Sequence, residues 1–328
     1  MLKRILVYFV LICSFQNTLH AQTQFSKVVL WGHKLTTHTH SWIHWGFKRA
    51  FQSMGYEVHW LDNSDDVSDI DFSNTLFITE GQVDGKIPLR SDCRYILHNC
   101  DAQKYQTLLE SGNCINLQVY TYKCEKEPVE KIDACIYADY HNKFIYMPWG
   151  TDLLPHEIEQ NKKTIQNVQK KKTVCWIGTI GGQKFGNLNQ VKPFRQAAER
   201  SGLAFFEKFM FLSMEENIQH VQESFVAPAI VGAWQLNEGY IPCRIFKNIS
   251  YGAMGVTNSK AVYDLFEQKI VYNQDTKQLF YDAKERIENL TWDELFELMD
   301  MVRDRHTYLN RIEHLFNFMN KIKPFDNP

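Results

Sequence analysis

A histidine-rich segment near the start of the chain has the residue types of a proton-transfer site. Four of the twelve histidines lie within it, namely His33, His38, His40 and His44. An imidazole with a pKa of about 6.5 can take a proton from a hydroxyl group at neutral pH, so His33, His38 and His40 are candidate general bases. The ordinary alternative is a loop whose histidines only form hydrogen bonds. Zinc binding is a third interpretation, but Trp42 stands where the His-x-His-x-Asp-His pattern has its aspartate, and we expect no metal site.

A second segment has the residue types of an anion-binding site. Pro242 stands at the start of a predicted helix over 242–251, and Gly252 follows the helix as a terminator. The N–H groups at a helix N-terminus attract anions, and Arg244 and Lys247 share one face of this helix. Two cations beside a helix N-terminus could neutralise a diphosphate. A solvated helix face with two ordinary charges is the alternative.

The elements that must hold these two segments alternate between apolar strands and helices. In the first half we predict a helix over 41–54 and strands over 26–31, 57–61, 75–79, 94–97, 115–120, 134–137 and 144–147. In the second half we predict helices over 191–200, 214–223 and 242–251 and strands over 173–177, 204–206, 225–230 and 255–257. This alternation predicts an α/β fold with parallel sheets, arranged as two Rossmann-like domains facing across a cleft.

The predicted elements divide the chain into five parts. We expect a signal peptide at 1–21, an N-terminal Rossmann-like domain at 22–155, a linker at 156–172, a C-terminal Rossmann-like domain at 173–285 and C-terminal helices at 286–328. Ligands of open α/β sheets bind beyond the carboxyl ends of the strands. The loops after Trp31, Ile177 and Ile230 should therefore face one groove between the domains.

The first residues have the three-part pattern of a secretory signal. Lys3 and Arg4 precede an apolar run over 5–15, and Ala21 offers a small residue for cleavage. We therefore expect export to a periplasm, the exterior or a secretory lumen, with an uncleaved anchor or a cytoplasmic location as alternatives. Seven cysteines follow the signal, none in a CxxC pair, and one or two disulfides in the first half would suit an exported chain.

Composition excludes several classes of protein. The chain has 328 residues, with 36 Lys and Arg against 38 Asp and Glu, so no excess of basic residues indicates a nucleic-acid partner. No run of 18 apolar residues is present, which excludes a multi-pass membrane protein. Peripheral association with a membrane remains compatible with this composition.

Two segments resemble the sugar-nucleotide glycosyltransferases of the GT-B architecture, whose site lies between two Rossmann-like domains. Residues 238–257, an acidic glycine-containing loop followed by a helix and a Gly-Val-Thr strand, resemble the donor-binding segment of that family. Residues 147–155, Met-Pro-Trp-Gly-Thr-Asp-Leu-Leu-Pro, resemble the Pro-Asn-Gly-Val-Asp segment where the chain crosses between domains. Ile177 and Gly178 match the first strand and glycine turn of the second domain. The likeness runs over roughly residues 25–285.

The resemblance implies a glycosyltransferase that moves a sugar, of hexosyl or fucosyl type, from a nucleoside-diphosphate sugar to a hydroxyl group of a glycan or glycoconjugate. It implies no cofactor and no metal, because cations and N–H groups stabilise the leaving diphosphate. A histidine or carboxylate of the first domain would be the base, with His33, His38 and His40 as candidates. The implied donor-binding residues are Gly178, Thr179, Glu238, Gly239, Arg244, Lys247 and Asn248.

One departure from the family leaves the stereochemistry open. Many retaining members have a second glutamate eight residues after the first, whereas this chain has Phe246 there, or Lys247 if one inserted residue is allowed. Two alternative functions also stay open. An exported two-lobed solute-binding protein would bind a free sugar without catalysis, and a sugar-nucleotide epimerase would use the same architecture. Solute-binding proteins cross between lobes several times, whereas we expect one crossing here, with the tail helices as the candidate for a return.

Overall fold

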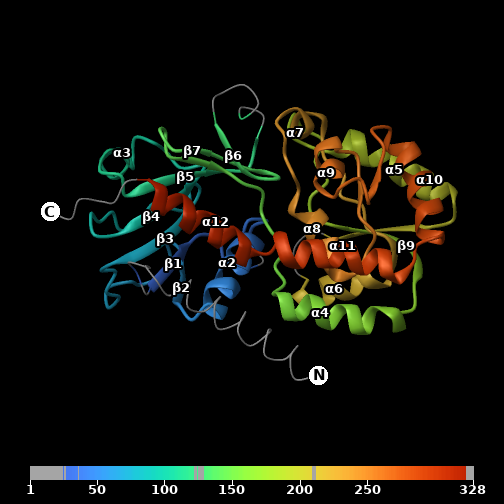
Figure 1. Cartoon of the computed structure of the whole chain (residues 1–328), viewed down its shortest axis with the longest axis horizontal. Coiled ribbons are helices and arrows are strands. Elements are labelled where there is room, and N and C mark those ends of the chain that lie inside the picture. The colour runs from blue at the N-terminus through green and yellow to red at the C-terminus, as the bar shows by residue number, and fades with distance from the viewer. Residues whose placement is uncertain are drawn as a thin grey trace, which may run out of the picture.

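The computed structural model describes residues 25, 27–35, 37–121, 124, 129–208 and 212–322, and it shows two α/β domains side by side (Figure 1). The predicted signal segment at 1–21 lies outside the described residues. Across the described ranges, no helix has both the length and the apolar character needed to cross a membrane.

The first domain is built on an eight-stranded sheet in the order β2-β1-β3-β4-β5-β8-β7-β6. Its strands are β1 (Lys27–Trp31), β2 (Glu57–Leu61), β3 (Thr75–Glu80), β4 (Arg94–His98), β5 (Cys114–Gln118), β6 (Glu130–Asp133), β7 (Ile136–Asp139) and β8 (Phe144–Tyr146). Its helices are α2 (Ser41–Ser53) and α3 (Gln106–Glu110). Strands β1 to β5 and β8 run parallel, and the central ones are almost wholly buried because their residues are apolar on both faces.

The edge of this sheet differs from the fully parallel arrangement that we predicted. β7 pairs antiparallel with both β6 and β8. Only four residues, 140–143, separate the end of β7 from the start of β8, and within this turn the Asn142 N–H donates to the Asp139 side chain at 2.9 Å. A parallel crossover needs a dozen or more residues, so a connection this short can only return antiparallel.

Local signals fix the start and end of α2, which positions the histidine-rich segment. His40 is the N-cap residue and Ser41 is the first helical residue, with its hydroxyl donating to the His38 carbonyl at 2.6 Å. We expected Ser41 to cap the helix, and the boundary is one residue earlier. Gly55, with a φ of 89°, ends the turn after the helix in a conformation that favours glycine. His40 is thereby held where the helix begins.

The second domain has a parallel sheet in two parts, β10-β9-β11 and β12-β13, which an isolated bridge between Ala229 and Thr257 brings together. Its strands are β9 (Lys171–Ile177), β10 (Ala204–Lys208), β11 (Ser224–Val226), β12 (Val256–Thr257) and β13 (Val271–Tyr272). Its helices are α5 (Leu188–Arg200), α6 (Met214–Glu223), α7 (Ala233–Asn237), α8 (Cys243–Tyr251), α9 (Lys260–Leu265), α10 (Thr276–Glu288) and α11 (Trp292–Arg305). Pro242 is the N-cap of α8, and Gly252 ends it with a φ of 102°.

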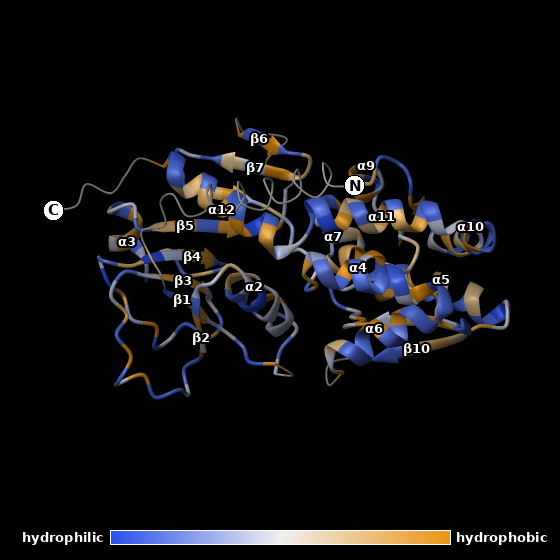
Figure 2. Cartoon of the chain, turned by 60° about the horizontal axis from the view of Figure 1, so that its bottom comes forward, coloured by the Kyte–Doolittle hydropathy of each residue, from blue (hydrophilic) through white to orange (hydrophobic). Residues whose placement is uncertain are grey.

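The segment at 156–172, which we expected as a linker, contains α4 (Pro155–Thr164), a short 3-10 helix over Ile165–Asn167 and the start of β9. Helix α4 is coloured largely hydrophilic (Figure 2), and Ile158 is its one buried residue. It lies against α11, where Lys162 forms an ion pair with Asp300 at 2.7 Å. The connection between the domains is therefore a structured part of the second domain.

The last helix, α12 (Tyr308–Lys321), returns to the first domain and packs against α2 (Figure 1). Phe316 contacts Phe25 and Phe51, with ring centres 5.5 Å and 6.1 Å apart. The two crossing segments lie side by side, since Thr151 and Thr307 form a parallel bridge. The chain thus crosses between the domains at least twice. We expected one crossing, with the tail helices as the candidate for a return, and α12 makes that return.

Arg311 stabilises the junction of the two crossing segments through buried hydrogen bonds. Its side chain is fully buried and donates to the carbonyls of Pro148 at 2.7 Å and Arg305 at 3.0 Å. Gly150 lies against the same segment, because a Cβ at that position would come within 2.8 Å of the His306 carbonyl oxygen. The crossing turn around residue 150 is therefore fixed by close backbone contact as well as by hydrogen bonds.

We considered disulfides between first-half cysteines. Among the described residues of that half, no disulfide is present between Cys93, Cys100, Cys114 and Cys135, and each has a free thiol. Burial raises the pKa of each of these four thiols to about 11 or 12. They remain protonated at neutral pH and behave as small apolar side chains.

Candidate active site

A cavity of about 310 Å³ lies between the two domains. The first domain contributes the start of α2, including Thr39, His40 and Trp42. The second contributes the loop after β9 and one face of α8. Both contributions come from the carboxyl ends of strands or the starts of helices, which is where open α/β sheets bind ligands.

The structure brings some of the predicted site residues to this cavity and leaves others outside it. His40, Gly178, Thr179, Arg244, Lys247 and Asn248 line it. His33, His38, Glu238 and Gly239 are absent from the lining. Glu238 is instead the residue after α7, and the Gly239 carbonyl accepts a hydrogen bond from Thr121 of the first domain at 3.0 Å. The acidic loop therefore contacts the opposite domain.

Arg244 is the cation best placed to receive an anion. Its guanidinium lies over the Trp176 ring at 4.0 Å from the ring centre, and its Nε donates to the Ile177 carbonyl at 3.0 Å. These two contacts hold the planar group in one orientation. Within the described part of the chain, no other hydrogen bond to this guanidinium is seen, so its remaining N–H groups are available to a ligand. Burial lowers the pKa of Arg244, but a guanidinium stays charged at neutral pH.

Gly178 makes this orientation feasible. Its φ of 123° is a conformation that favours glycine, and a Cβ there would come within 2.5 Å of Nη2 of Arg244. The Gly178 N–H donates to the Lys208 carbonyl at 2.9 Å, which shapes the turn after β9. A side chain at this position would displace the guanidinium from the cavity.

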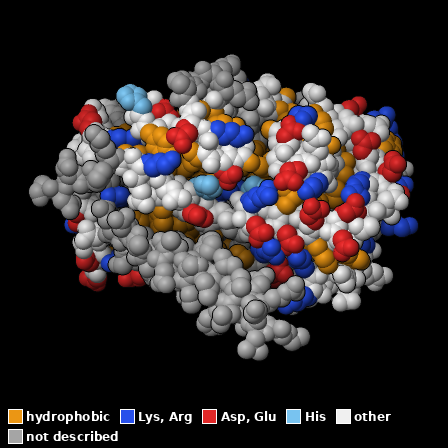
Figure 3. Space-filling model, in the orientation of Figure 1, with side chains coloured by type: hydrophobic (Ala, Val, Ile, Leu, Met, Phe, Trp, Pro, Cys, Tyr) orange, Lys and Arg blue, Asp and Glu red, His pale blue; other side chains and the backbone are white. Residues whose placement is uncertain are grey.

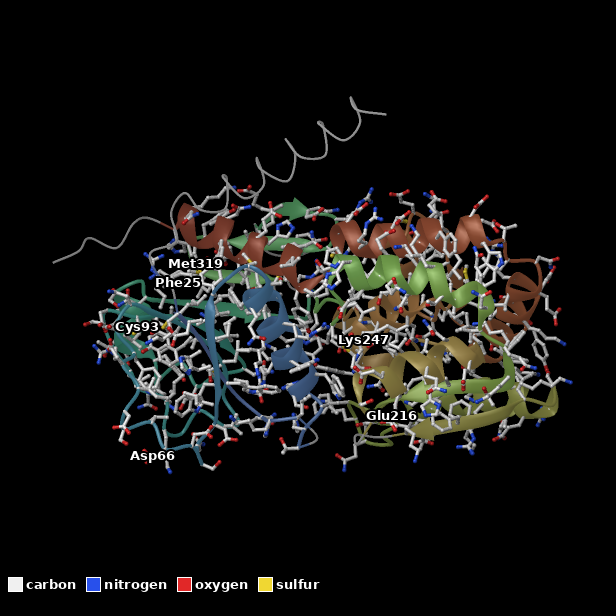
Figure 4. All side chains as sticks on the ribbon, turned by 90° about the horizontal axis from the view of Figure 1, so that it is seen from below. Phe25, Asp66, Cys93, Glu216, Lys247 and Met319 are labelled. Atoms are coloured by element: carbon white, nitrogen blue, oxygen red, sulfur yellow. The ribbon has the colours of Figure 1, made fainter. Side chains whose placement is uncertain are left out.

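Lys247 is placed differently from Arg244, although both lie on α8. Its ammonium forms an ion pair with the buried carboxylate of Asp152 at 2.8 Å and lies 4.8 Å from the centre of the Trp42 ring. Tyr251 donates to the other oxygen of Asp152 at 2.7 Å. Figure 4 shows Lys247 at the junction of the two domains. Its charge is already compensated, so the residue fixes the crossing segment and is a weaker candidate for binding phosphate.

Asn248 connects α8 to the sheet of the second domain. Its side-chain amide donates to the Ala227 carbonyl, which follows β11, at 2.8 Å. The side chain is buried at the cavity wall. This hydrogen bond therefore holds α8, the helix that carries Arg244, against the sheet of the second domain.

His40 and Glu80 form a pair on the opposite side of the cavity. Nδ1 of His40 is hydrogen-bonded to Oε2 of Glu80, the last residue of β3. Burial by itself would raise the pKa of Glu80, but the hydrogen bond from His40 and the nearby histidine charges lower it to about 2. The carboxylate can only accept, so Nδ1 carries the proton and Nε2 keeps a free lone pair. A histidine held in this tautomer by a buried carboxylate is equipped to act as a general base.

The other histidines of the segment pack behind His40. The ring of His33 stacks on that of His38 with centres 4.2 Å apart, and Nδ1 of His38 accepts from the backbone N–H of His40 at 3.2 Å. Burial, together with the charges of His40 and His33, lowers the pKa of His38. Burial lowers the pKa of His44 to about 4. Of the three candidate bases, only His40 reaches the cavity.

The buried histidines should make stability depend on pH. Burial lowers the pKa of His98 to about 4 from an ordinary value of 6.5. Between these pH values the unfolded chain binds more protons, so stability falls as the pH decreases, by up to about 3 kcal/mol for His98. We expect His98→Gln to reduce the loss of unfolding free energy between pH 6.5 and pH 5, measured by urea denaturation. An unchanged pH dependence in this variant would contradict neutral burial of His98.

Sequence reasoning missed several cavity residues. Asn187, Asn217, Gln235 and Tyr240 are polar groups on the second-domain wall. Asn187 also accepts from the Gly181 N–H at 3.2 Å, which folds the loop after β9 back on itself. The glycines of this loop are the sequence signal that could have found it, because its backbone segments pack closely together. A Cβ at residue 186 would come within 2.0 Å of the Gly181 carbonyl oxygen.

The arrangement of elements matches solved structures at low sequence identity. An α-glucosyltransferase in complex with UDP and a 13-mer DNA containing a HMU base has a TM-score of 0.56 at 9% identity, over 90% of this chain and 99% of that chain. AviGT4, a glycosyltransferase involved in Avilamycin A biosynthesis, has a TM-score of 0.54 at 10% identity, over 90% and 97%. The N-terminal domain of Candida albicans trehalose-6-phosphate phosphatase has a TM-score of 0.52 at 8% identity, over 93% and 98%.

No family model matches the chain, and no curated protein matches its sequence. The structural neighbours nevertheless define the class of fold, which is GT-B. The prediction of two Rossmann-like domains facing across a cleft is confirmed, and so is the resemblance to this architecture. One fold can support unrelated activities, so the function has to be argued from the cavity.

Proposed function

We propose that the protein is a glycosyltransferase that moves a sugar from a nucleoside-diphosphate sugar to a hydroxyl group. The observation that carries this proposal is the pairing of Arg244 with the His40–Glu80 pair on opposite walls of one cavity. The first is a fixed cation with free N–H groups, and the second is a fixed base. Sugar transfer needs both, because negative charge develops on the leaving diphosphate while the acceptor hydroxyl loses its proton.

The residues of the cavity suggest how the reaction would proceed. Arg244 and the backbone N–H of Thr179 would bind the diphosphate, and the missing side chain at Gly178 would let it approach. His40 would accept the acceptor proton at Nε2, with the resulting imidazolium stabilised by Glu80. The hydroxyl oxygen would then form a bond to the anomeric carbon as the bond from that carbon to the diphosphate breaks. The diphosphate would leave as an anion held by Arg244, and the leaving step would need no metal.

A carbohydrate acceptor is the second part of the proposal. A row of aromatic rings runs from Tyr240, which lines the cavity, to Tyr120 of the first domain. Trp234 contacts Phe185 and Tyr120, with ring centres 4.6 Å and 5.1 Å apart, and Tyr120 contacts Tyr240 at 5.5 Å. Phe185 is 57% exposed although it is a large apolar side chain. An exposed aromatic side chain at the end of this row of rings suits the apolar face of a sugar ring.

A nucleic-acid acceptor is less suited to this chain. One structural neighbour is described in complex with DNA, which concerns that protein. Here the chain has a net charge of −2, and on the face shown in Figure 3 acidic and basic side chains are intermixed over the second domain. DNA binding depends on neutralising phosphates with lysine and arginine. The absence of a nucleic-acid partner stays a prediction.

Ligand binding followed by product analysis tests the function. We expect UDP, or another nucleoside diphosphate, to raise the melting temperature, and a labelled nucleotide sugar to transfer its label to a saccharide acceptor. Stabilisation by a free sugar and by no nucleotide would indicate the solute-binding alternative. Conversion of the donor sugar without an acceptor would indicate the epimerase. The proposal fails if neither nucleotides nor nucleotide sugars bind.

The location of the protein is part of the proposal as well. The basic and apolar pattern of residues 1–21 supports export, with cleavage after Ala21. Sequencing of the mature N-terminus from a fractionated cell would test it. Recovery of the intact chain from the cytoplasmic fraction would favour the cytoplasmic alternative.

A further inference from the structure

Three side chains next to His40, those of His33, His38 and Glu80, bring atoms that can bind a metal close together. The ligand atoms of His33, His38 and Glu80 all lie within 4.8 Å of one another. They come from the segment between β1 and α2 and from the end of β3, which are adjacent parts of the first domain. His33 and His38 have no place in the proposed transfer reaction, so their arrangement calls for a separate explanation.

One oxygen of Glu80 supports a ligand at this point. Oε2 is hydrogen-bonded to His40, whereas Oε1 is buried without a hydrogen bond and lies 3.4 Å from Nε2 of His33. Glu80 is 2% exposed, and a buried carboxylate oxygen with no hydrogen bond is unfavourable. Neighbouring ligands of a tetrahedral zinc ion are about 3.3 Å apart, given bonds of about 2.0–2.1 Å. The spacing between Oε1 and Nε2 is therefore that of two zinc ligands.

A metal would bind these side chains through imidazole nitrogens and a carboxylate oxygen. His38 has to move closer to complete a tetrahedron, and it gives up a 3.2 Å hydrogen bond from the His40 backbone if it binds through Nδ1.

We propose that His33, His38 and Glu80 form a binding site for a divalent transition-metal ion of the Zn²⁺ type. Two imidazoles and one carboxylate are the ligand set of many zinc sites that keep an open fourth position for water. Mg²⁺ and Ca²⁺ prefer oxygen ligands and bind little here. This site replaces the expectation from the sequence that the chain has no metal site, because it uses Glu80, which is distant from the histidines along the chain.

The position of the site gives the metal a regulatory effect, and this step rests on the proposed function. Glu80 is shared between His40 and the metal site. A Zn²⁺ bound to Oε1 withdraws negative charge from the carboxylate that pairs with His40 through Oε2, so Glu80 stabilises the His40 imidazolium less. Transfer should therefore slow as Zn²⁺ occupies the site, while nucleotide binding on the second domain is unaffected.

Binding is tested on the full chain after treatment with a chelator. The probes are Zn²⁺ by calorimetry and Co²⁺ by visible absorption, which reports tetrahedral nitrogen and oxygen ligation. We expect one equivalent to bind, and His33→Ala and His38→Ala each to weaken binding by at least about 10-fold to 100-fold. His59→Ala is the matched control, because His59 also pairs with a glutamate, Glu57, at 2.6 Å but on the surface and outside the cluster.

Several results would overturn the proposal. One is the absence of Zn²⁺ binding to the folded wild-type chain at micromolar concentrations. Another is unchanged Zn²⁺ binding in both His33→Ala and His38→Ala, with folding verified by circular dichroism. Equal weakening by His59→Ala would assign the ion to the general surface. Zn²⁺ binding that leaves the transfer rate unchanged would overturn the regulatory step alone, and binding without any transfer activity would instead disprove the proposed function.

Discussion

Replacing His40 with alanine is expected to lower the rate of sugar transfer by about 100-fold to 10,000-fold, the usual contribution of a general base. Among the three histidines that the sequence nominated, only His40 lines the cavity. Its tautomer is fixed by a buried carboxylate, so the loss removes both the base and its orientation. Nucleotide affinity should stay unchanged, because the proposed donor contacts lie on the second domain. Steady-state kinetics and nucleotide calorimetry on the same preparation measure both quantities.

Two further variants make the result specific. Glu80→Gln keeps the size of the side chain and removes the charge that stabilises the imidazolium, so an intermediate loss of rate is expected. His59→Ala removes an exposed histidine of the same domain and should leave the rate as it is in the wild type. If His40→Ala retained the wild-type rate within a few-fold, the base would have to be sought elsewhere in the cavity.

Replacing Arg244 with alanine is expected to weaken nucleoside-diphosphate binding by about 10-fold to 100-fold. This corresponds to the roughly 1.5–3 kcal/mol of hydrogen bonds to a charged group. Transfer should fall by more than binding, because charge on the diphosphate increases in the transition state. Arg244→Lys keeps the charge but loses the hydrogen bond to Ile177 and the planar contact with Trp176, so it should recover only part of the loss.

Arg195→Ala is the matched control for this experiment. Arg195 lies in the same domain and also stacks over an aromatic ring, that of Phe205, at 4.9 Å. It is surface-exposed and outside the cavity lining. Calorimetry with UDP should give wild-type affinity for Arg195→Ala. Equal weakening in both variants, or none in Arg244→Ala, would remove the basis for placing the diphosphate at α8.

Local signals made much of the fold predictable. The capping pair Thr291 and Glu294 starts α11, because the Thr291 hydroxyl accepts a hydrogen bond from the Glu294 N–H. Gly252 ends α8 because a positive φ costs glycine little. Such signals depend on a few adjacent residues. The return of α12 to α2 depends instead on contacts between distant parts of the chain, which no local pattern encodes.

The same distinction explains the outcome at the site. Arg244 and Lys247 look equivalent in the sequence, three residues apart on one helix face. The difference between them arises from Asp152, almost a hundred residues away along the chain, which pairs with Lys247 alone. Likewise, the choice of His40 among three histidines depends on which of them reaches the cavity wall. Residue type and spacing nominated the candidates, and tertiary contacts decide which of them line the cavity.

The return of α12 to the first domain has a consequence for biosynthesis. Phe316 and Tyr308 complete an aromatic cluster with Phe47 and Phe51 of α2, and residues 54–307 separate the two helices. A ribosome would therefore release the first domain long before its last core residues emerge. The N-terminal half must wait, with those phenylalanines uncovered, until synthesis is nearly complete. We therefore expect chaperones that bind exposed apolar surface to bind the nascent chain.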